Sequence, residues 1–268
     1  LGIGDLADRN LPLDTCVATA RRALDAGLNV IDTAPNYEDG YSEQIVGRAV
    51  AGRDRDRVFV IDKIDHADAP VGPQIDGSLG RLGLEYADLF VFHAVSDAAV
   101  FDRLCQPGGG FDQLADAVRA GKCRFRGVSS HHPDVLRAAL VAGVCDVVMF
   151  PVGPFVDPRY VTDILPLAKA KGVGTVCFKT FGGGKLVGDT TGYNQPLRQR
   201  PRGKVSSGGA DGATAELPRL TAAECLHYTL TLDPDVALLG LSYPNEQDAA
   251  FAAARAFRPL PPDAMADV

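Results

Sequence analysis

Apolar and polar positions follow a regular rhythm along the whole chain. Short apolar runs, typical of strands buried on both faces, alternate with longer segments whose apolar residues recur at helical spacing. The pattern predicts strands at 1–4, 28–31, 57–61, 87–92, 123–128, 146–150, 173–178 and 236–239. It predicts helices at 13–26, 43–50, 71–82, 111–120, 133–142, 160–171, 221–232 and 246–257.

Strict alternation of strand and helix predicts a parallel sheet with helices as crossover connections. The number of pairs and the 268 residues of the chain favour a single (β/α)₈ barrel, a TIM-barrel α/β fold, over residues 1–268. A doubly wound sheet is the second possibility. It is less favoured because no G-x-G-x-x-G segment follows a predicted strand at the start of a helix.

One segment interrupts the rhythm. Residues at about 182–220 follow the predicted strand 173–178 and are rich in Gly, Pro, Ser and Arg. Long connections in compact domains are commonly lids or mobile segments. We therefore expect a loop or lid insertion in the barrel.

Composition excludes some classes of protein. Apolar residues make up 46% of the chain, as in ordinary globular proteins, and the net charge is −7. A negative chain has no electrostatic driving force toward nucleic acid or an anionic membrane, so neither partner is expected. The pattern leaves the oligomeric state open.

The cysteines point to a reducing compartment. Six cysteines are scattered singly and none forms a C-x-x-C pair, which indicates free thiols rather than disulfides or a zinc site. The sequence contains no apolar run of membrane-spanning length and no signal-peptide pattern. We expect a cytoplasmic protein.

Polar groups stand at the ends of three consecutive predicted strands. Asp32 follows the second strand, Lys63 the third and His93 the fourth, while Tyr37 lies on the loop after Asp32. Each residue alone has an ordinary structural explanation, such as a cap, a solvated strand end or a packing aromatic. Together, on successive βα loops of a barrel, they indicate an active site.

The residue types suit proton transfer to an oxygen. A tyrosine phenol has an ordinary pKa of about 10, and a neighbouring Lys63 ammonium paired with Asp32 is expected to lower it. Tyr37 is then a general acid, and His93 can hydrogen-bond a carbonyl oxygen. Carbonyl reduction fits this set, and its hydride must come from a cofactor.

At these residues the chain resembles the aldo-keto reductase family. Residues 27–50 (GLNVIDTAPNYEDGYSEQIVGRAV) are similar to the family's signature segment, and similar segments follow in order at 82–93, 121–129, 165–186 and 226–247. The resemblance implies a barrel that binds NADP or NAD and interconverts an aldehyde or ketone and an alcohol. In that scheme Tyr37 is the general acid, Lys63 and Asp32 tune it, and His93 positions the carbonyl.

The resemblance also implies cofactor contacts. Ser129 and Ser130 stand where the family holds the nicotinamide carboxamide, Phe178 where an aromatic ring stacks under the nicotinamide, and Gly182 and Gly183 where backbone approaches the pyrophosphate. The full set of implied cofactor residues is Ser129, Ser130, Phe178, Lys179, Thr180, Phe181, Gly182, Gly183, Ser242 and Gln247.

Three positions near the expected nicotinamide site depart from the family's pattern. Ser130 replaces an asparagine, Phe178 a tyrosine, and Met149 a glutamine whose amide contact a thioether cannot make. Residues 240–254 contain no Lys or Arg, where NADP-preferring members carry a basic residue. The sequence therefore leans to NAD but leaves NADP open, since the loop residues Arg198, Arg200, Arg202 and Lys204 could substitute.

Two other functions remain open. His93, His131 and Asp32, together with His66, could form a divalent-metal site of a barrel hydrolase, although that reading leaves Tyr37 without a role. A nucleotide-binding regulatory barrel without turnover is also possible, because fold does not fix function. The reductase interpretation requires no metal.

Overall fold

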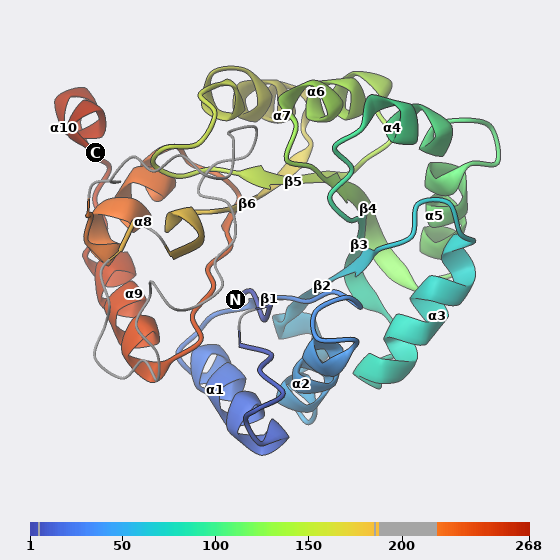
Figure 1. Ribbon diagram of the computed structural model, residues 1–268, viewed down its shortest axis with the longest axis horizontal. Coiled ribbons are helices and arrows are strands. Elements are labelled where there is room, and N and C mark those ends of the chain that lie inside the picture. The colour runs from blue at the N-terminus through green and yellow to red at the C-terminus, as the bar shows by residue number, and fades with distance from the viewer. Residues whose placement is uncertain (5, 185, 188–218) are drawn as a thin grey trace. The chain divides into compact units, whose positions relative to one another are not determined.

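The computed structural model describes residues 1–4, 6–184, 186–187 and 219–268 (Figure 1). Most of the predicted lid at 182–220 lies outside the described residues, and so do Arg198, Arg200, Arg202 and Lys204. Two compact units can be distinguished. The first comprises Leu1–Val148 with Gly240–Ser242, and the second comprises Met149–Leu239 with Tyr243–Val268.

The first unit is built from strands that alternate with helices. Its strands are β1 (Val30–Asp32), β2 (Phe59–Ile64), β3 (Ala87–Phe92) and β4 (Cys123–Ser129). Its helices are α1 (Leu13–Asp25), α2 (Tyr41–Val50), the short 3₁₀ turn η1 (Arg55–Arg57), α3 (Val71–Leu82), α4 (Ala98–Leu104), α5 (Gly110–Arg119) and α6 (Pro133–Ala142).

The four strands of this unit form a parallel ladder in chain order. β1 pairs with β2, β2 with β3, and β3 with β4. Helices α1, α2, α3 and α5 lie along its outer face (Figure 1). All of β3 is buried, as expected for a strand covered on both faces. Because the strands are parallel, their carboxyl ends meet at one edge, and that edge carries the candidate site.

Helices α2 and α3 approach closely at a glycine. A Cβ added to Gly47 would lie 2.0 Å from the carbonyl oxygen of Leu82. Only glycine permits this separation. The contact fixes α2, which begins directly after the loop of Tyr37, against α3.

The second unit continues the alternation. β5 (Val147–Pro151) includes the boundary between the units, and β6 (Gly174–Phe178) pairs in parallel with β7 (Val236–Ala237). The helices here are η2 (Tyr160–Ile164), α7 (Leu165–Lys171), η3 (Gly182–Gly184), α8 (Ala222–Thr231), α9 (Pro244–Ala256) and α10 (Pro262–Asp267).

The structure refines several predicted boundaries. The expected strand at 1–4 is an isolated bridge, in which Gly2 pairs with Asp32 and with Gly240. The helix expected at 160–171 begins as a π-helical turn and becomes α-helical at Leu165, directly before Pro166, whose missing N–H cannot continue an interior ladder.

Two local features differ from the prediction. Helix α4 was not predicted, although the Asp97 carboxylate caps it by accepting from the N–H of Ala99 at 2.7 Å. β2 extends to Ile64 rather than ending at Ile61, so Lys63 lies within the strand. The two charged residues 62 and 63 broke the apolar pattern and concealed this extension.

The six cysteines are free, as predicted, and all but Cys105 are buried. Among the described residues, no helix has both the length and the apolar character needed to cross a membrane.

Candidate active site

A buried ion pair joins Asp32 and Lys63 at the carboxyl edge of the first unit. Lys63 Nζ lies 2.8 Å and 2.9 Å from the two carboxylate oxygens of Asp32 and 2.6 Å from the carbonyl oxygen of Thr33. Both side chains are almost fully buried. Burial is the largest single influence and lowers the pKa of Lys63, but the charge and hydrogen bonds of Asp32, together with neighbouring groups, raise that pKa above its ordinary value. Lys63 is therefore a fixed positive charge at neutral pH.

Tyr37 packs against this charge. Lys63 Nζ lies 4.6 Å from the centroid of the Tyr37 ring, and Gly4 faces the same ring, since a Cβ placed there would meet it at 3.5 Å. The expectation that Lys63 lowers the pKa of Tyr37 below its ordinary value is wrong. Burial raises the pKa of Tyr37, and the charge of Lys63 only partly offsets it. The phenol is protonated at neutral pH.

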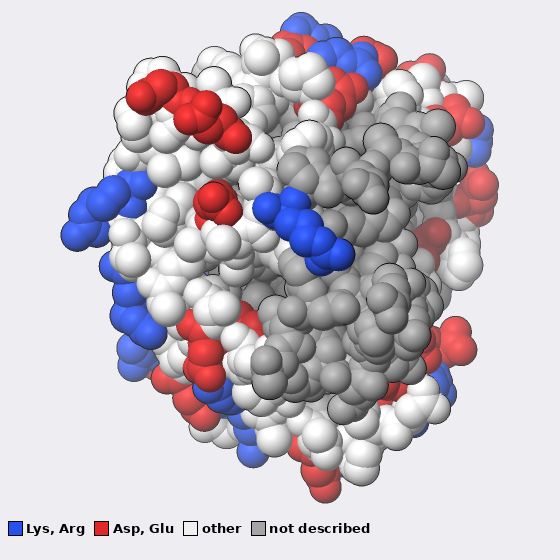
Figure 2. Space-filling model, turned by 60° about the vertical axis from the view of Figure 1, so that its left-hand side comes forward, with Lys and Arg blue, Asp and Glu red and all other residues white. Residues whose placement is uncertain are grey.

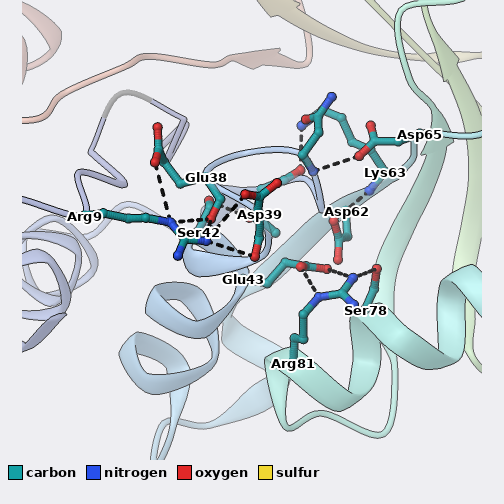
Figure 3. Close-up of polar contacts among 12 residues, drawn as sticks. Arg9, Glu38, Asp39, Ser42, Glu43, Asp62, Lys63, Asp65, Ser78 and Arg81 are labelled. Atoms are coloured by element: carbon teal, nitrogen blue, oxygen red, sulfur yellow. Dashed lines mark hydrogen bonds and ion pairs between the residues drawn. The ribbon is translucent and has the colours of Figure 1, made fainter.

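An arginine holds the loop that carries Tyr37. Glu38 and Asp39 both have positive φ, at 52° and 49°, a strained backbone for residues with side chains. Arg9 donates to the carbonyl oxygen of Glu38 at 3.0 Å and to that of Asp39 at 3.3 Å (Figure 3). These bonds tie the loop after β1 to the segment before α1 and offset its strain.

His93 completes the predicted set and has an acidic partner. Its ring lies edge-on to that of Tyr37, with centroids 5.7 Å apart. Its Nδ1 atom lies 2.5 Å from Asp65 Oδ1, and Asp65 Oδ2 accepts from the backbone N–H of Asn36 at 2.8 Å. Burial opposes ionisation, but the hydrogen bond and charge of His93 hold the pKa of Asp65 below its usual value. Asp65 thus links His93 to the residue before Tyr37.

Sequence reasoning missed Asp65, although it stands directly after β2 in the run VFVIDKID. Its place, one residue past the end of a parallel strand, is the signal that could have identified it.

Two buried acidic residues, Glu43 and Asp62, lie below Lys63 in Figure 3. Glu43 of α2 and Asp62 of β2 are completely buried. Arg81 of α3 donates to both carboxylate oxygens of Glu43 and to Ser78 Oγ at 3.2 Å. Asp62 Oδ1 accepts from the N–H of Lys63 at 2.8 Å. Burial, followed by the negative charge of Glu43, raises the pKa of Asp62 well above its ordinary value. Arg81 therefore balances Glu43, and Asp62 is the member of the pair that keeps a proton.

The two serines expected at the carboxamide site are both buried. Ser129 Oγ accepts from the N–H of Ala94 at 2.8 Å, which leaves its own hydroxyl proton available. Ser130 Oγ accepts from the N–H of His132 at 2.9 Å and donates to the carbonyl oxygen of the same residue at 3.3 Å. The Ser130 hydroxyl is therefore already engaged in hydrogen bonds within the turn before α6. Ser242 belongs to the same unit and follows Gly240, the bridge partner of Gly2.

The other expected cofactor residues, at 178–183 and 247, belong to the second unit. Lys179, Gly182 and Gly183 have φ of 74°, 57° and 66°, and such turns can present consecutive backbone N–H groups to an anion. Thr180 Oγ1 is buried and has no hydrogen-bond partner within the described part of the chain. Gln247 is completely buried in α9. A buried unpartnered hydroxyl beside a glycine turn fits a phosphate-bearing ligand.

The hypothesis of a divalent-metal site finds no support here. Within residues 1–4, 6–184, 186–187 and 219–268, no group of three or more His, Cys, Asp or Glu side chains could hold a metal ion. The side chain of His66 is exposed, and the backbone N–H of His131 points to Ser96 Oγ at 3.3 Å.

Comparisons with known proteins identify similar reductases and dehydrogenases. The NADH-specific methylglyoxal reductase of Escherichia coli (strain K12) is 26% identical over 212 residues, which are 71% of this chain and 64% of that protein. The L-galactose dehydrogenase of Arabidopsis thaliana is 28% identical over 175 residues, which are 61% of this chain and 54% of that protein. The chain thus spans less than two thirds of the length of either relative.

A solved structure matches the fold over the full chain. The aldo-keto reductase from Klebsiella pneumoniae in complex with NADPH superposes on this chain with a TM-score of 0.73 at 22% identity. The matched region comprises 100% of this chain and 88% of the Klebsiella pneumoniae chain. The family profile described as Aldo/keto reductase family matches residues 1–264. The fold is therefore the (β/α)₈ barrel that the alternation predicted, and the chain belongs to the aldo/keto reductase family.

Proposed function

We propose that the protein is an NAD(P)(H)-dependent oxidoreductase that interconverts an aldehyde or ketone and an alcohol. The observation that carries the proposal is the grouping of a tyrosine, a buried Lys–Asp pair and a histidine at one strand edge. One relative is named a methylglyoxal reductase and another an L-galactose dehydrogenase, and a solved neighbour is in complex with NADPH, which supports the proposal.

The residues divide the proton chemistry among them. Tyr37 donates its phenolic proton to the oxygen that becomes an alkoxide, and takes it back in the reverse direction. The Lys63 ammonium stabilises the phenolate that remains, because it sits 4.6 Å from the ring centroid as a fixed charge. Asp32 keeps that ammonium in place. His93 orients the substrate oxygen beside Tyr37.

The nicotinamide cofactor, when bound, supplies or accepts the hydride. Of the two serines, Ser129 is better placed to hydrogen-bond the carboxamide of the nicotinamide, because Ser129 Oγ only accepts a hydrogen bond in its loop and keeps its proton to donate. Phe178 offers a ring face, and the turn at Gly182 and Gly183 with Thr180 offers donors to the diphosphate. Ser242 and Gln247 complete the proposed cofactor residues.

Charge favours NAD over NADP within the described residues. Residues 240–254 carry no Lys or Arg. At the start of α9, the carboxylate of Glu246 already accepts from the backbone N–H of Tyr243 at 3.1 Å. A carboxylate at this helix terminus repels a 2′-phosphate and satisfies a donor that a phosphate would need.

The proposed partners are a small carbonyl or alcohol and the dinucleotide. On the face in Figure 2, acidic and basic side chains are interspersed over the described surface. The absence of a nucleic-acid partner stays a prediction from the net charge. The cytoplasmic location expected from the free thiols stays a prediction.

The test combines binding and turnover. Calorimetric titration with NADH and, separately, NADPH measures cofactor affinity, and reduction of methylglyoxal and of a panel of aldehydes, ketones and aldoses measures activity. Turnover with any of these carbonyls supports the proposal. Tight dinucleotide binding without turnover in either direction would replace it with a regulatory role.

A further inference from the structure

The hydrogen bond between Asp65 and His93 fixes which ring nitrogen carries a proton. Asp65 Oδ1 lies 2.5 Å from His93 Nδ1, and Asp65 Oδ2 accepts from the N–H of Asn36. With its pKa held low, Asp65 is ionised at neutral pH and can only accept hydrogen bonds. The proton in this contact therefore belongs to His93 Nδ1.

This assignment restricts the other ring nitrogen. A neutral imidazole carries one N–H, so a ring protonated at Nδ1 has a bare lone pair at Nε2. Such a nitrogen accepts from an alcohol but repels a carbonyl oxygen. Only the doubly protonated ring can donate from Nε2.

We propose that Asp65 is a positioning residue for His93, which it locks with the proton on Nδ1, so that Nε2 hydrogen-bonds a carbonyl oxygen only while the ring is doubly protonated. The inference rests on the proposed function only for its catalytic consequence, since the proton assignment holds for the free protein. Protonation of one imidazole thus selects between the carbonyl and the alcohol as its hydrogen-bond partner.

Other charges near His93 leave this assignment intact. Tyr37 faces the ring edge-on and is protonated, so it brings no charge. The Lys63 ammonium acts on Asp65 and favours its ionised form. Asp65 is the acidic group in contact with the imidazole, with only 9% of its side chain exposed.

The first test is a spectroscopic measurement on the cofactor-free protein. Nitrogen-15 NMR of the ring nitrogens, above the pH at which His93 becomes neutral, should show a protonated Nδ1 and an unprotonated Nε2. The His93→Gln variant identifies the signal among the five histidines of the chain. A neutral ring protonated at Nε2 in the unaltered protein would overturn the proposal.

The variant Asp65→Asn tests the cause. An amide can donate to Nδ1, which allows the neutral ring to carry its proton on Nε2, so the NMR tautomer signal should shift toward that form. Asp68→Asn is the matched control, because Asp68 lies on the same loop, is 79% exposed and pairs with Arg103. The control should keep the tautomer of the unaltered protein, and an unchanged tautomer in Asp65→Asn contradicts the proposal.

The catalytic consequence is read from the pH profile of carbonyl reduction. In the unaltered protein kcat/KM should fall above the pH at which NMR shows His93 losing its second proton. In Asp65→Asn that fall should vanish, because the neutral ring can then donate from Nε2. A purely structural role would lower kcat/KM equally at every pH and would overturn the inference. A protein without any turnover disproves the proposed function, while the NMR result still decides the tautomer.

Discussion

The ammonium of Lys63 lies 4.6 Å from the centroid of the Tyr37 ring, yet the pKa of Tyr37 is raised, because burial outweighs that charge. The resting site therefore holds a neutral phenol beside a fixed cation. The cation is best suited to stabilise the phenolate that appears once the proton has left. Stabilisation that grows during proton transfer is the kind that accelerates a reaction.

Tyr37→Phe removes the proton donor and keeps the ring against Gly4 and Lys63. We expect turnover to fall by about 10²–10⁴-fold, the usual contribution of a positioned acid, with cofactor affinity unchanged. Steady-state kinetics and calorimetric titration with NADH measure the two effects separately. Reduction at the rate of the unaltered protein would disprove the role of Tyr37.

Lys63 and Asp32 are expected to be strongly coupled in stability. Lys63→Met leaves a buried carboxylate without a counter-ion, and Asp32→Leu leaves a buried ammonium, so each single change should cost about 3–5 kcal/mol of unfolding free energy. The double variant should be more stable than the sum of the two losses predicts, because neither charge remains. Urea denaturation of the four proteins completes the cycle. Additive losses would show that the pair is not coupled.

Much of this site could be read from the sequence because it follows one rule of barrels. Asp32, Lys63 and His93 each stand at or near the end of a strand, and parallel strands bring those ends together. Asp65 and Asp62 were missed for a different reason. Their roles depend on partners from other elements, namely His93 after β3 and Glu43 on α2, and only the folded register brings these within reach.

Boundaries and energies were the least predictable features. The strand around Lys63 was expected to end at Ile61 because residues 62 and 63 are charged, but both are buried and paired. The direction of the Tyr37 pKa shift depends on how deeply the ring is buried, which a sequence pattern does not quantify.

Asp62 should make the stability of the protein depend on pH above its unfolded pKa. Its folded pKa is raised above the ordinary value of 3.8, so the folded state binds more protons than the unfolded chain between those two values. The free energy of unfolding contributed by this group falls as pH rises through that window. Asp62→Asn should remove the fall and stabilise the protein at neutral pH, as measured by urea denaturation from pH 4 to 8.

Asp65 acts in the opposite sense and in another window. Its folded pKa is lowered, so its stabilising contribution is present above pH 3.8 and is lost as pH falls through the folded pKa. Asp62→Asn should change the pH dependence of the unfolding free energy only above pH 3.8, because below that pH the Asp62 carboxyl is protonated in both the folded and the unfolded state. An identical pH dependence in variant and parent would contradict the assignment.

Arg81 should stabilise the protein far more than an ordinary surface arginine. It balances Glu43, which is completely buried, whereas its own side chain is 38% exposed. Arg81→Met should cost about 2–3 kcal/mol of unfolding free energy, somewhat less than for a fully buried pair because water still reaches the guanidinium.

Arg119→Met is the matched control for Arg81→Met. Arg119 also pairs with a carboxylate, Asp116, but both side chains are largely exposed, so the loss there should stay below about 0.5 kcal/mol. Equal losses in the two variants would mean that Glu43 does not depend on Arg81.

The relative affinity for NADH and NADPH tests whether the negative charge of Glu246 at the start of α9 disfavours NADPH. NADH should bind at least as tightly as NADPH, because Glu246 occupies the helix terminus and residues 240–254 contain no cation. Glu246→Gln removes the negative charge and keeps a side chain that can accept from the N–H of Tyr243. NADPH affinity should then rise by about two- to fivefold, the range given by helix-terminus electrostatics, while NADH affinity stays constant. Calorimetric titration of both proteins with both cofactors gives the four constants. A parent protein that binds NADPH more than about tenfold tighter, a difference of about 1.4 kcal/mol, would show that cations elsewhere hold the 2′-phosphate.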